Sequence, residues 1–187
     1  MNSKIIGWQK FMLRRKLVGS LMLSILLAAC NQTTPKVIAL EPTSETASAV
    51  DGMLLKNYPG PKAQIHYAQG QPEFFSDLKE MFSTLLVPEQ KRSVTAVFVQ
   101  DMGKTSWEHP TGNWIDAKTA IYVAGSKKMG SMGPTFGSFS SMQDAEAFVK
   151  KEGGKIVRFE QITPDMLNKS ESGAAAHDAM MSHDKEE

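Results

Sequence analysis

Methionine is the residue type whose placement in this 187-residue chain suggests chemistry. Nine of the 12 methionines lie beyond residue 30. Met53 stands in a polar Asp51-Gly52-Met53 stretch, and Met129 and Met132 lie in a glycine-rich loop, so none of them has the regular spacing of a packed helix face. A thioether is a soft, neutral ligand that suits Cu(I) better than Zn²⁺ or Mg²⁺ and needs no deprotonation. These residues are therefore candidate ligands for a soft metal, with ordinary packing as the alternative.

The remaining methionines give a weaker signal. Met81 lies on an apolar helix face and is expected in the core, and Met142 and Met166 are also expected to pack. The stretch 169–187 is predicted to be a disordered tail. It is either a plain acidic tail or a second group of soft ligands, formed by His177, Met180, Met181 and His183.

The sequence gives little support to catalysis. It contains no G-x-S-x-G nucleophile elbow, no H-E-x-x-H pair and no phosphate-binding G-x-x-x-x-G-K-[ST] loop. His66 and His109 are isolated, and a surface position is the default for His66. The single cysteine, Cys30, excludes intramolecular disulfides and metal sites built from several thiolates. We therefore expect that the protein is not an enzyme.

The N-terminus is predicted to direct the chain to a membrane. Residues 1–29 carry five basic residues and no acid, followed by a short apolar run that is typical of a secretory signal. The run ends Leu-Ala-Ala-Cys, which resembles the bacterial lipobox and implies cleavage before Cys30 and lipidation of that cysteine. Asn31 follows, which favours the outer membrane in proteobacteria. Residues 30–50 are rich in Thr, Ser, Ala and Pro, and are predicted to be a flexible, lipidated tether.

The body has no basic surface for nucleic acid. The formal net charge is +1, but the chain without its first 29 residues has 16 basic against 20 acidic residues. Nucleic-acid binding depends on basic groups that neutralise phosphates. We therefore exclude that class of function.

The body is predicted to be α+β, with two similar ββαβ units over residues 51–103 and 104–168. In the first unit, alternation and β-branched residues predict strands over 62–67, 73–75 and 93–100, with a helix that is capped by Ser76 and runs to Leu86. The second unit repeats the order. It has a strand over 114–124, a loop over 125–137 and a short strand over 135–138. A helix over 142–152 capped by Ser140 or Ser141 follows, and then a strand over 155–159. Units of this size bury little core alone, so we expect them to pack together.

A set of short motifs covers about residues 51–168 of the body. They are Asp51-Gly52-Met53, Gly60-Pro-Lys-Ala-Gln64, Asp101-Met102-Gly103, Trp107 with Pro110, Trp114-Ile-Asp-Ala117, Gly125-Ser126, Met132-Gly133 and Gly153-Gly154. Their order resembles that of the NosL family of lipoprotein accessory factors for nitrous oxide reductase. The resemblance implies the ββαβ repeat and a periplasm-facing Cu(I) chaperone for the reductase's copper–sulfide cluster in denitrification.

The resemblance also implies a ligand set. Met53 and Met132 match the family's metal methionines, and Asp51 stands where most members have cysteine. A carboxylate is harder than a thiolate, so Asp51 either ligates Cu(I) or bridges to a second ion such as Zn²⁺, completed by a histidine. Met102, Met129, His66 and His109 are the secondary candidates.

Two functions follow from these observations. The first is a Cu(I) metallochaperone that serves nitrous oxide reductase and its assembly machinery from a lipid anchor. The alternative is a lipoprotein that docks and scaffolds reductase assembly without carrying metal.

Overall fold

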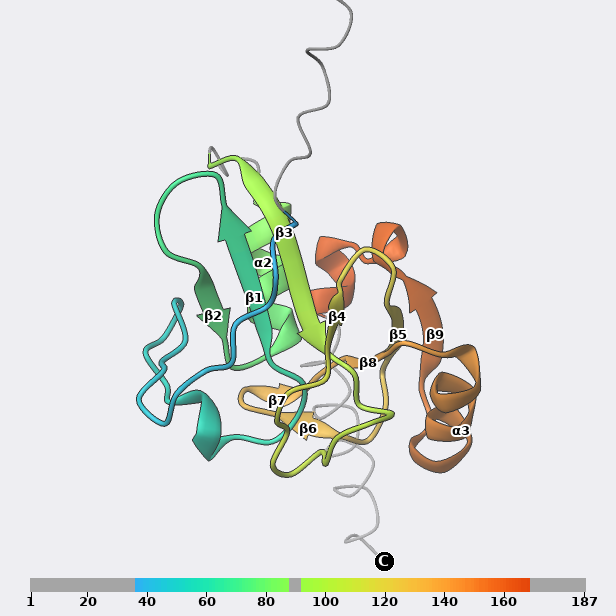
Figure 1. Cartoon of the computed structure of the whole chain (residues 1–187). Coiled ribbons are helices and arrows are strands. Elements are labelled where there is room, and N and C mark those ends of the chain that lie inside the picture. The colour runs from blue at the N-terminus through green and yellow to red at the C-terminus, as the bar shows by residue number, and fades with distance from the viewer. Residues whose placement is uncertain (1–35, 88–91, 169–187) are drawn as a thin grey trace, which may run out of the picture. The chain divides into compact units, whose positions relative to one another are not determined.

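The structure is a computed structural model that describes residues 36–87 and 92–168 (Figure 1). Its elements lie in one compact unit that starts at Val37. The predicted signal peptide, Cys30 and the tail 169–187 fall outside the described residues. Within the two described ranges, none of the helices combines the length and hydropathy that crossing a bilayer requires. The expected mixture of helix and sheet is confirmed.

A four-stranded antiparallel sheet has the order β2-β1-β3-β4. Its strands are β1 (Ala63–Tyr67), β2 (Glu73–Phe75), β3 (Val94–Gln100) and β4 (Trp114–Asp116). In the register, Ile65 of β1 is opposite Glu73 of β2 and Val97 of β3. Ala63, Ile65 and Tyr67 pack with the helix α2 (Leu78–Leu86) on one face of this sheet, as the alternation of β1 predicts.

The other face of β1 is covered by the segment before the sheet. Oε1 of Gln64 accepts the backbone N–H of Leu40 at 2.8 Å, and Nε2 of Gln64 donates to the Leu40 carbonyl at 2.9 Å. Glu41 accepts the indole N–H of Trp114 at 2.8 Å. The prediction of a flexible tether over residues 30–50 is therefore wrong from residue 37 onward. The segment has the composition of a linker, but the Gln64 side chain on the sheet forms hydrogen bonds with the backbone N–H and carbonyl of Leu40.

A second, three-stranded sheet has the order β8-β5-β9. It consists of β5 (Ile121–Ala124), β8 (Gly137–Phe139) and β9 (Lys155–Arg158), and α3 (Met142–Glu152) packs on it. The described residues also contain two short 3-10 helices, η1 (Leu55–Asn57) and η2 (Phe159–Gln161). A small hairpin is formed by β6 (Met129–Gly130) and β7 (Gly133–Pro134).

The predicted strand over 114–124 is two strands in different sheets. Asp116 turns the chain, because its side chain accepts the N–H of Lys118 at 2.8 Å and its carbonyl accepts that of Ala120 at 3.1 Å. β4 then pairs with β3, whereas β5 is the central strand of the second sheet. The elements therefore do not divide cleanly at residue 103, because β4 lies beyond it and still belongs to the first sheet.

The two sheets share one core. Phe82 of α2 lies 5.3 Å, centroid to centroid, from Tyr122 of β5, and 5.6 Å from both Phe136 and Phe159. The expectation that Met81 lies in the core is confirmed, since its side chain is fully buried in the same cluster. This shared aromatic packing holds the loops of both sheets in fixed positions.

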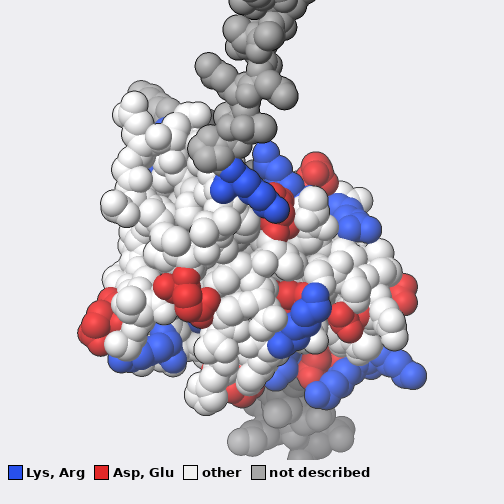
Figure 2. All heavy atoms as spheres, in the orientation of Figure 1, with Lys and Arg blue, Asp and Glu red and all other residues white. Residues whose placement is uncertain are grey.

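The helix starts follow local capping rules. α2 begins one residue later than predicted, because Asp77 and not Ser76 is its N-cap and accepts the N–H of Lys79 at 2.8 Å. α3 has the predicted Ser141 cap, and it ends at Gly153, whose φ of 76° favours glycine. On the face in Figure 2, acidic and basic side chains are interspersed on a largely uncharged surface.

Candidate metal centre

The predicted ligands Asp51 and Met53 share one tight turn before η1. Oδ1 of Asp51 accepts the backbone N–H of Met53 at 2.9 Å. The N–H of Ser48 donates to the Met53 carbonyl at 2.8 Å, and the N–H of Gly52 donates to the Ser48 carbonyl at 3.0 Å. Asp51 is exposed and Met53 half-buried. The turn therefore presents a carboxylate and a thioether two residues apart at the surface. We call residues 48–53 the aspartate turn.

Met132 lies at the tip of the β6–β7 hairpin (residues 129–134), which we call the methionine hairpin. In that hairpin Gly130 is paired with Gly133, so Ser131 and Met132 form the two-residue turn. The Met132 side chain is 59% exposed, and that of Met129 is 53% exposed. A large apolar side chain at an exposed turn has no packing role there. Both thioethers are therefore open to an incoming metal or partner.

Hydrogen bonds fix the hairpin to its surroundings. The indole N–H of Trp107 donates to the Met129 carbonyl at 2.9 Å, and the Thr135 hydroxyl donates to Oδ1 of Asp77 at 2.6 Å. Gly130 packs so closely on the Asp77 carboxylate that a Cβ atom would collide with it. The glycine loop is thus a docked hairpin, and glycine at position 130 permits the close approach.

A chain of buried hydrogen bonds connects the aspartate turn to the hairpin. The Ser48 hydroxyl donates to Oε2 of Glu80 at 2.7 Å, and Glu80 also accepts the N–H of Ser76 at 3.1 Å and its hydroxyl at 3.2 Å. The Ser76 and Ser131 hydroxyl oxygens are 2.8 Å apart. Both ligand-bearing turns are therefore anchored at the N-terminus of α2.

Charged groups are buried beneath this region. Nζ of Lys62 donates to the carbonyls of Tyr58, Pro59 and Ser76 at 2.8–3.1 Å. Burial lowers the pKa of Lys62 to about 8, against the opposing effect of the Asp77 and Glu80 charges. Burial raises the pKa of Asp77 and of Glu80. The carboxylates thus lie close enough to a buried cation to be partly compensated.

His66 is placed on the outer face of β1, away from the aspartate turn's contacts. It is only 9% exposed, its Nε2 lies 2.7 Å from Oε1 of Gln64, and its ring packs edge-on against Phe98. Burial lowers the pKa of His66. The expectation of a surface histidine is therefore wrong, because the segment from residue 37 covers this face.

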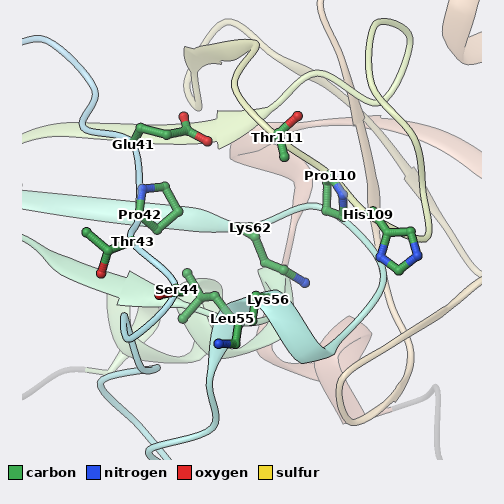
Figure 3. A pocket seen from close by; sticks show the side chains of 10 residues that line it. All are labelled: Glu41, Pro42, Thr43, Ser44, Leu55, Lys56, Lys62, His109, Pro110 and Thr111. Atoms are coloured by element: carbon green, nitrogen blue, oxygen red, sulfur yellow. The ribbon is translucent and has the colours of Figure 1, made fainter.

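His109 lines a cavity of about 310 Å³ (Figure 3). The loop that carries His109 and Pro110 forms one side of it, Pro42 and Thr43 form the other, and Lys62 extends between them. The backbone N–H of His109 donates to the Ser106 hydroxyl at 3.4 Å. None of the described contacts of His109 reaches either ligand-bearing turn.

Of the other methionines considered in the sequence, two are packed and one is exposed. Met102, a secondary ligand candidate, is 9% exposed and packs with Val123 and Phe139 in a hydrophobic cluster. Met166 is half-buried against the main core, as expected. Met142, the first residue of α3, is 39% exposed, so its predicted packing role is wrong.

The sequence profile of the NosL family matches residues 39–167 of this chain. The chain belongs to the NosL family. It is 34% identical over 168 residues to the copper-binding lipoprotein NosL of Stutzerimonas stutzeri, covering 88% of this chain and 87% of the relative. It is 38% identical over 149 residues to the protein of the same description from Achromobacter cycloclastes, covering 76% and 77%.

A solved NosL structure has a similar fold. The crystal structure of the copper chaperone NosL from Shewanella denitrificans matches with a TM-score of 0.67 and 38% identity, covering 70% of this chain and 99% of that one. The family resemblance predicted from the short motifs is therefore confirmed.

Sequence reasoning missed the polar groups that anchor the NosL turns, namely Ser48, Ser76, Glu80 and Ser131. Glu80 is three residues after the N-cap Asp77, a spacing that indicates a capping box. That signal points to local capping, whereas the contacts of Glu80 reach 32 residues back along the chain. Among the described residues, no three His, Cys, Asp or Glu side chains are grouped as a metal site.

Proposed function

We propose that this protein is a Cu(I) metallochaperone that holds copper with the thioethers of Met53 and Met132 and the carboxylate of Asp51. The observation that carries the proposal is the anchoring of both ligand-bearing turns at the N-terminus of α2 in a NosL-family chain. Relatives at 34% and 38% identity are described as copper-binding lipoproteins. Two thioethers and one carboxylate give a soft site with a single negative charge, which suits a monovalent soft cation.

The exposure of the ligands supports transfer. Met132 is 59% exposed, so an acceptor's ligand can approach it without unfolding the site. Thioethers release Cu(I) without taking up a proton, so transfer depends on the competing ligands and not on pH at these two groups.

We place the protein on the periplasmic side of the outer membrane, anchored by lipid on Cys30. The lipobox and Asn31 support this location. The acceptor in this proposal is nitrous oxide reductase with its assembly machinery, where the copper–sulfide site is built. The chain carries cargo and performs no catalysis.

A competition titration tests the proposal. The full-length Cys30→Ser protein, purified without lipid, is titrated with Cu(I) in the presence of a chromophoric chelator. We expect one Cu(I) per chain, and the same stoichiometry for lipidated protein in detergent. A folded protein that takes no copper from the chelator at any ratio would instead support the scaffold function.

A further inference from the structure

Glu80 is 8% exposed and is one of three buried acidic residues in the described chain, together with Asp77 and Asp101. Its carboxylate joins the segments that carry the aspartate turn and the hairpin. It accepts hydrogen bonds from Ser48, which begins the aspartate turn, and from Ser76, whose hydroxyl meets Ser131 of the hairpin. Ser131 immediately precedes Met132. Each link is short, and the Ser48–Glu80 and Ser76–Glu80 bonds are buried.

We propose that Glu80 is the positioning residue of the copper site, which fixes the aspartate turn and the methionine hairpin relative to each other through Ser48, Ser76 and Ser131. The inference rests on the proposed function and adds to it a residue that does not touch the metal. Its physical basis is entropic, because two turns held in the binding arrangement before the metal arrives lose less freedom on binding.

The geometry also predicts how a conservative substitution behaves. In Glu80→Gln, the amide oxygen can replace Oε2 and accept from Ser48 and the Ser76 N–H. The amide N–H₂ then faces the Ser76 hydroxyl, which can reverse and donate to Ser131, since a hydroxyl both donates and accepts. The chain of contacts survives without the charge. Glu80→Ala removes it altogether.

Three variants cut the chain at different points. Glu80→Ala cuts it at the centre, Ser48→Ala detaches only the aspartate turn, and Ser131→Ala detaches only the hairpin. Ser140→Ala is a matched control, because its hydroxyl lies 3.0 Å from Nζ of the exposed Lys104 and contacts neither ligand turn. The ligands themselves are unchanged in all four variants.

The experiment measures Cu(I) affinity by chelator competition for each variant in the full-length Cys30→Ser protein, and repeats Glu80→Ala in a Met132→Leu background. We expect Glu80→Ala to weaken affinity about tenfold, the equivalent of one buried hydrogen-bond link. Ser48→Ala and Ser131→Ala should each weaken affinity several-fold. Glu80→Gln and Ser140→Ala should stay within about twofold of the unvaried protein.

The Met132→Leu background separates positioning from general damage. If Glu80 acts by orienting Met132, then Glu80→Ala should change the residual affinity of Met132→Leu by less than about twofold. An equal loss in both backgrounds would overturn the inference, and so would a loss in Glu80→Gln as large as that in Glu80→Ala, which would assign the effect to charge. Unchanged affinity in Glu80→Ala would overturn it while leaving the proposed function intact. No copper uptake by the unvaried protein would overturn both.

Discussion

The two α-helices of the described chain, α2 and α3, start with a similar capping pattern and use it differently. α3 has the N-cap Ser141 and, three residues on, Asp144, whose carboxylate lies 2.7 Å from the Ser141 hydroxyl. α2 has the N-cap Asp77 and, three residues on, Glu80. Asp144 makes its hydrogen bond within its own helix cap, whereas Asp77 and Glu80 bond to segments 58 and 32 residues away. An acid at the third helical position can therefore serve local capping, as in α3, or join segments that are distant in sequence, as in α2.

At the start of each α-helix, the backbone of a glycine also packs closely against an acidic side chain. The Cα atom of Gly130 lies against Asp77, and that of Gly103 lies against Asp144, and a Cβ atom at either position would overlap the carboxylate. Gly130 belongs to the methionine hairpin, and Gly103 to the loop after β3. The two glycines therefore make comparable contacts at the two helix starts.

The largest effects are expected from filling these two contacts. Gly130→Ala and Gly103→Ala should each lower the free energy of unfolding by about 1–3 kcal/mol, because the added methyl group overpacks a close contact. Only Gly130→Ala should also weaken Cu(I) binding, since it displaces the hairpin from α2. Urea unfolding and chelator competition measure the two quantities. Equal copper affinities in the two variants would show that the contact at α2 matters no more for copper binding than the contact at α3.

A smaller, pH-dependent effect separates the acids beside each helix start. Asp101, next to α3, is buried, which would raise its pKa, but hydrogen bonds from Ser140, Lys104 and Gly103 keep that pKa below the ordinary value of 3.8. Its charged form therefore stabilises the fold above pH 3.8, and this contribution is lost as the pH falls through the lower pKa of the folded state. The pKa of Asp77 is raised by burial, so folding favours its protonated form.

The stability gap between the wild type and Asp101→Asn should therefore be widest near pH 7 and close as the pH falls. The gap for Asp77→Asn should change in the opposite direction, with wild-type stability gaining on the variant as the pH falls. Urea unfolding at pH 7, 5 and 3 checks both slopes. Slopes of the same sign would show that the two helix starts do not differ electrostatically.

A still smaller effect is expected from the α3 cap. Ser141→Ala removes the hydroxyl that accepts the N–H of Asp144 at 3.1 Å, and loss of such a cap costs about 1 kcal/mol. Copper affinity should not change, because this cap contacts only its own helix. Thermal unfolding without metal, together with a copper titration, gives both numbers. A copper defect here would mean that α3 also supports the site.

The smallest effect is expected from removing residues 169–187. Ordering a tail of this kind around a metal costs about 1–2 kcal/mol per residue in backbone entropy, which its histidines and methionines do not recover without a fixed frame. Deletion should therefore lower copper loading only slightly in a competition titration. Disappearance of the only tight site would place the ligands in the tail.

Much of the fold could be predicted because its signals are local. The alternation of β1 and β3, the Ser141 cap and the Gly153 stop all lie within a few residues of the elements that they define. The division of 114–124 into two strands was missed because the Asp116 turn interrupts an apparently continuous β-like run. The hairpin strands at 129–130 and 133–134 are too short for periodicity to indicate them.

The site was predictable only in its most exposed parts. The setting of Met53 and Met132 in polar or glycine-rich stretches marked them as unlikely to pack, and Met132 is indeed exposed. The burial of His66 and the anchoring role of Glu80 depend on segments that meet only in the folded chain. Their sequence separations of 24 residues for Gln64 with Leu40 and 55 for Ser76 with Ser131 hide them from any local pattern.

The central claim is that Met53 and Met132 ligate one Cu(I). Met→Leu removes the sulfur and keeps nearly the same volume. At Cu(I) about 100 times the Kd, the wild type should gain about 2.7 kcal/mol of stability. Thermal unfolding with and without Cu(I) should show that Met53→Leu and Met132→Leu each keep the metal-free melting point and lose most of the copper-induced rise. The buried control Met81→Leu should keep that rise. Retention of the full rise by both the Met53 and Met132 variants would contradict the account.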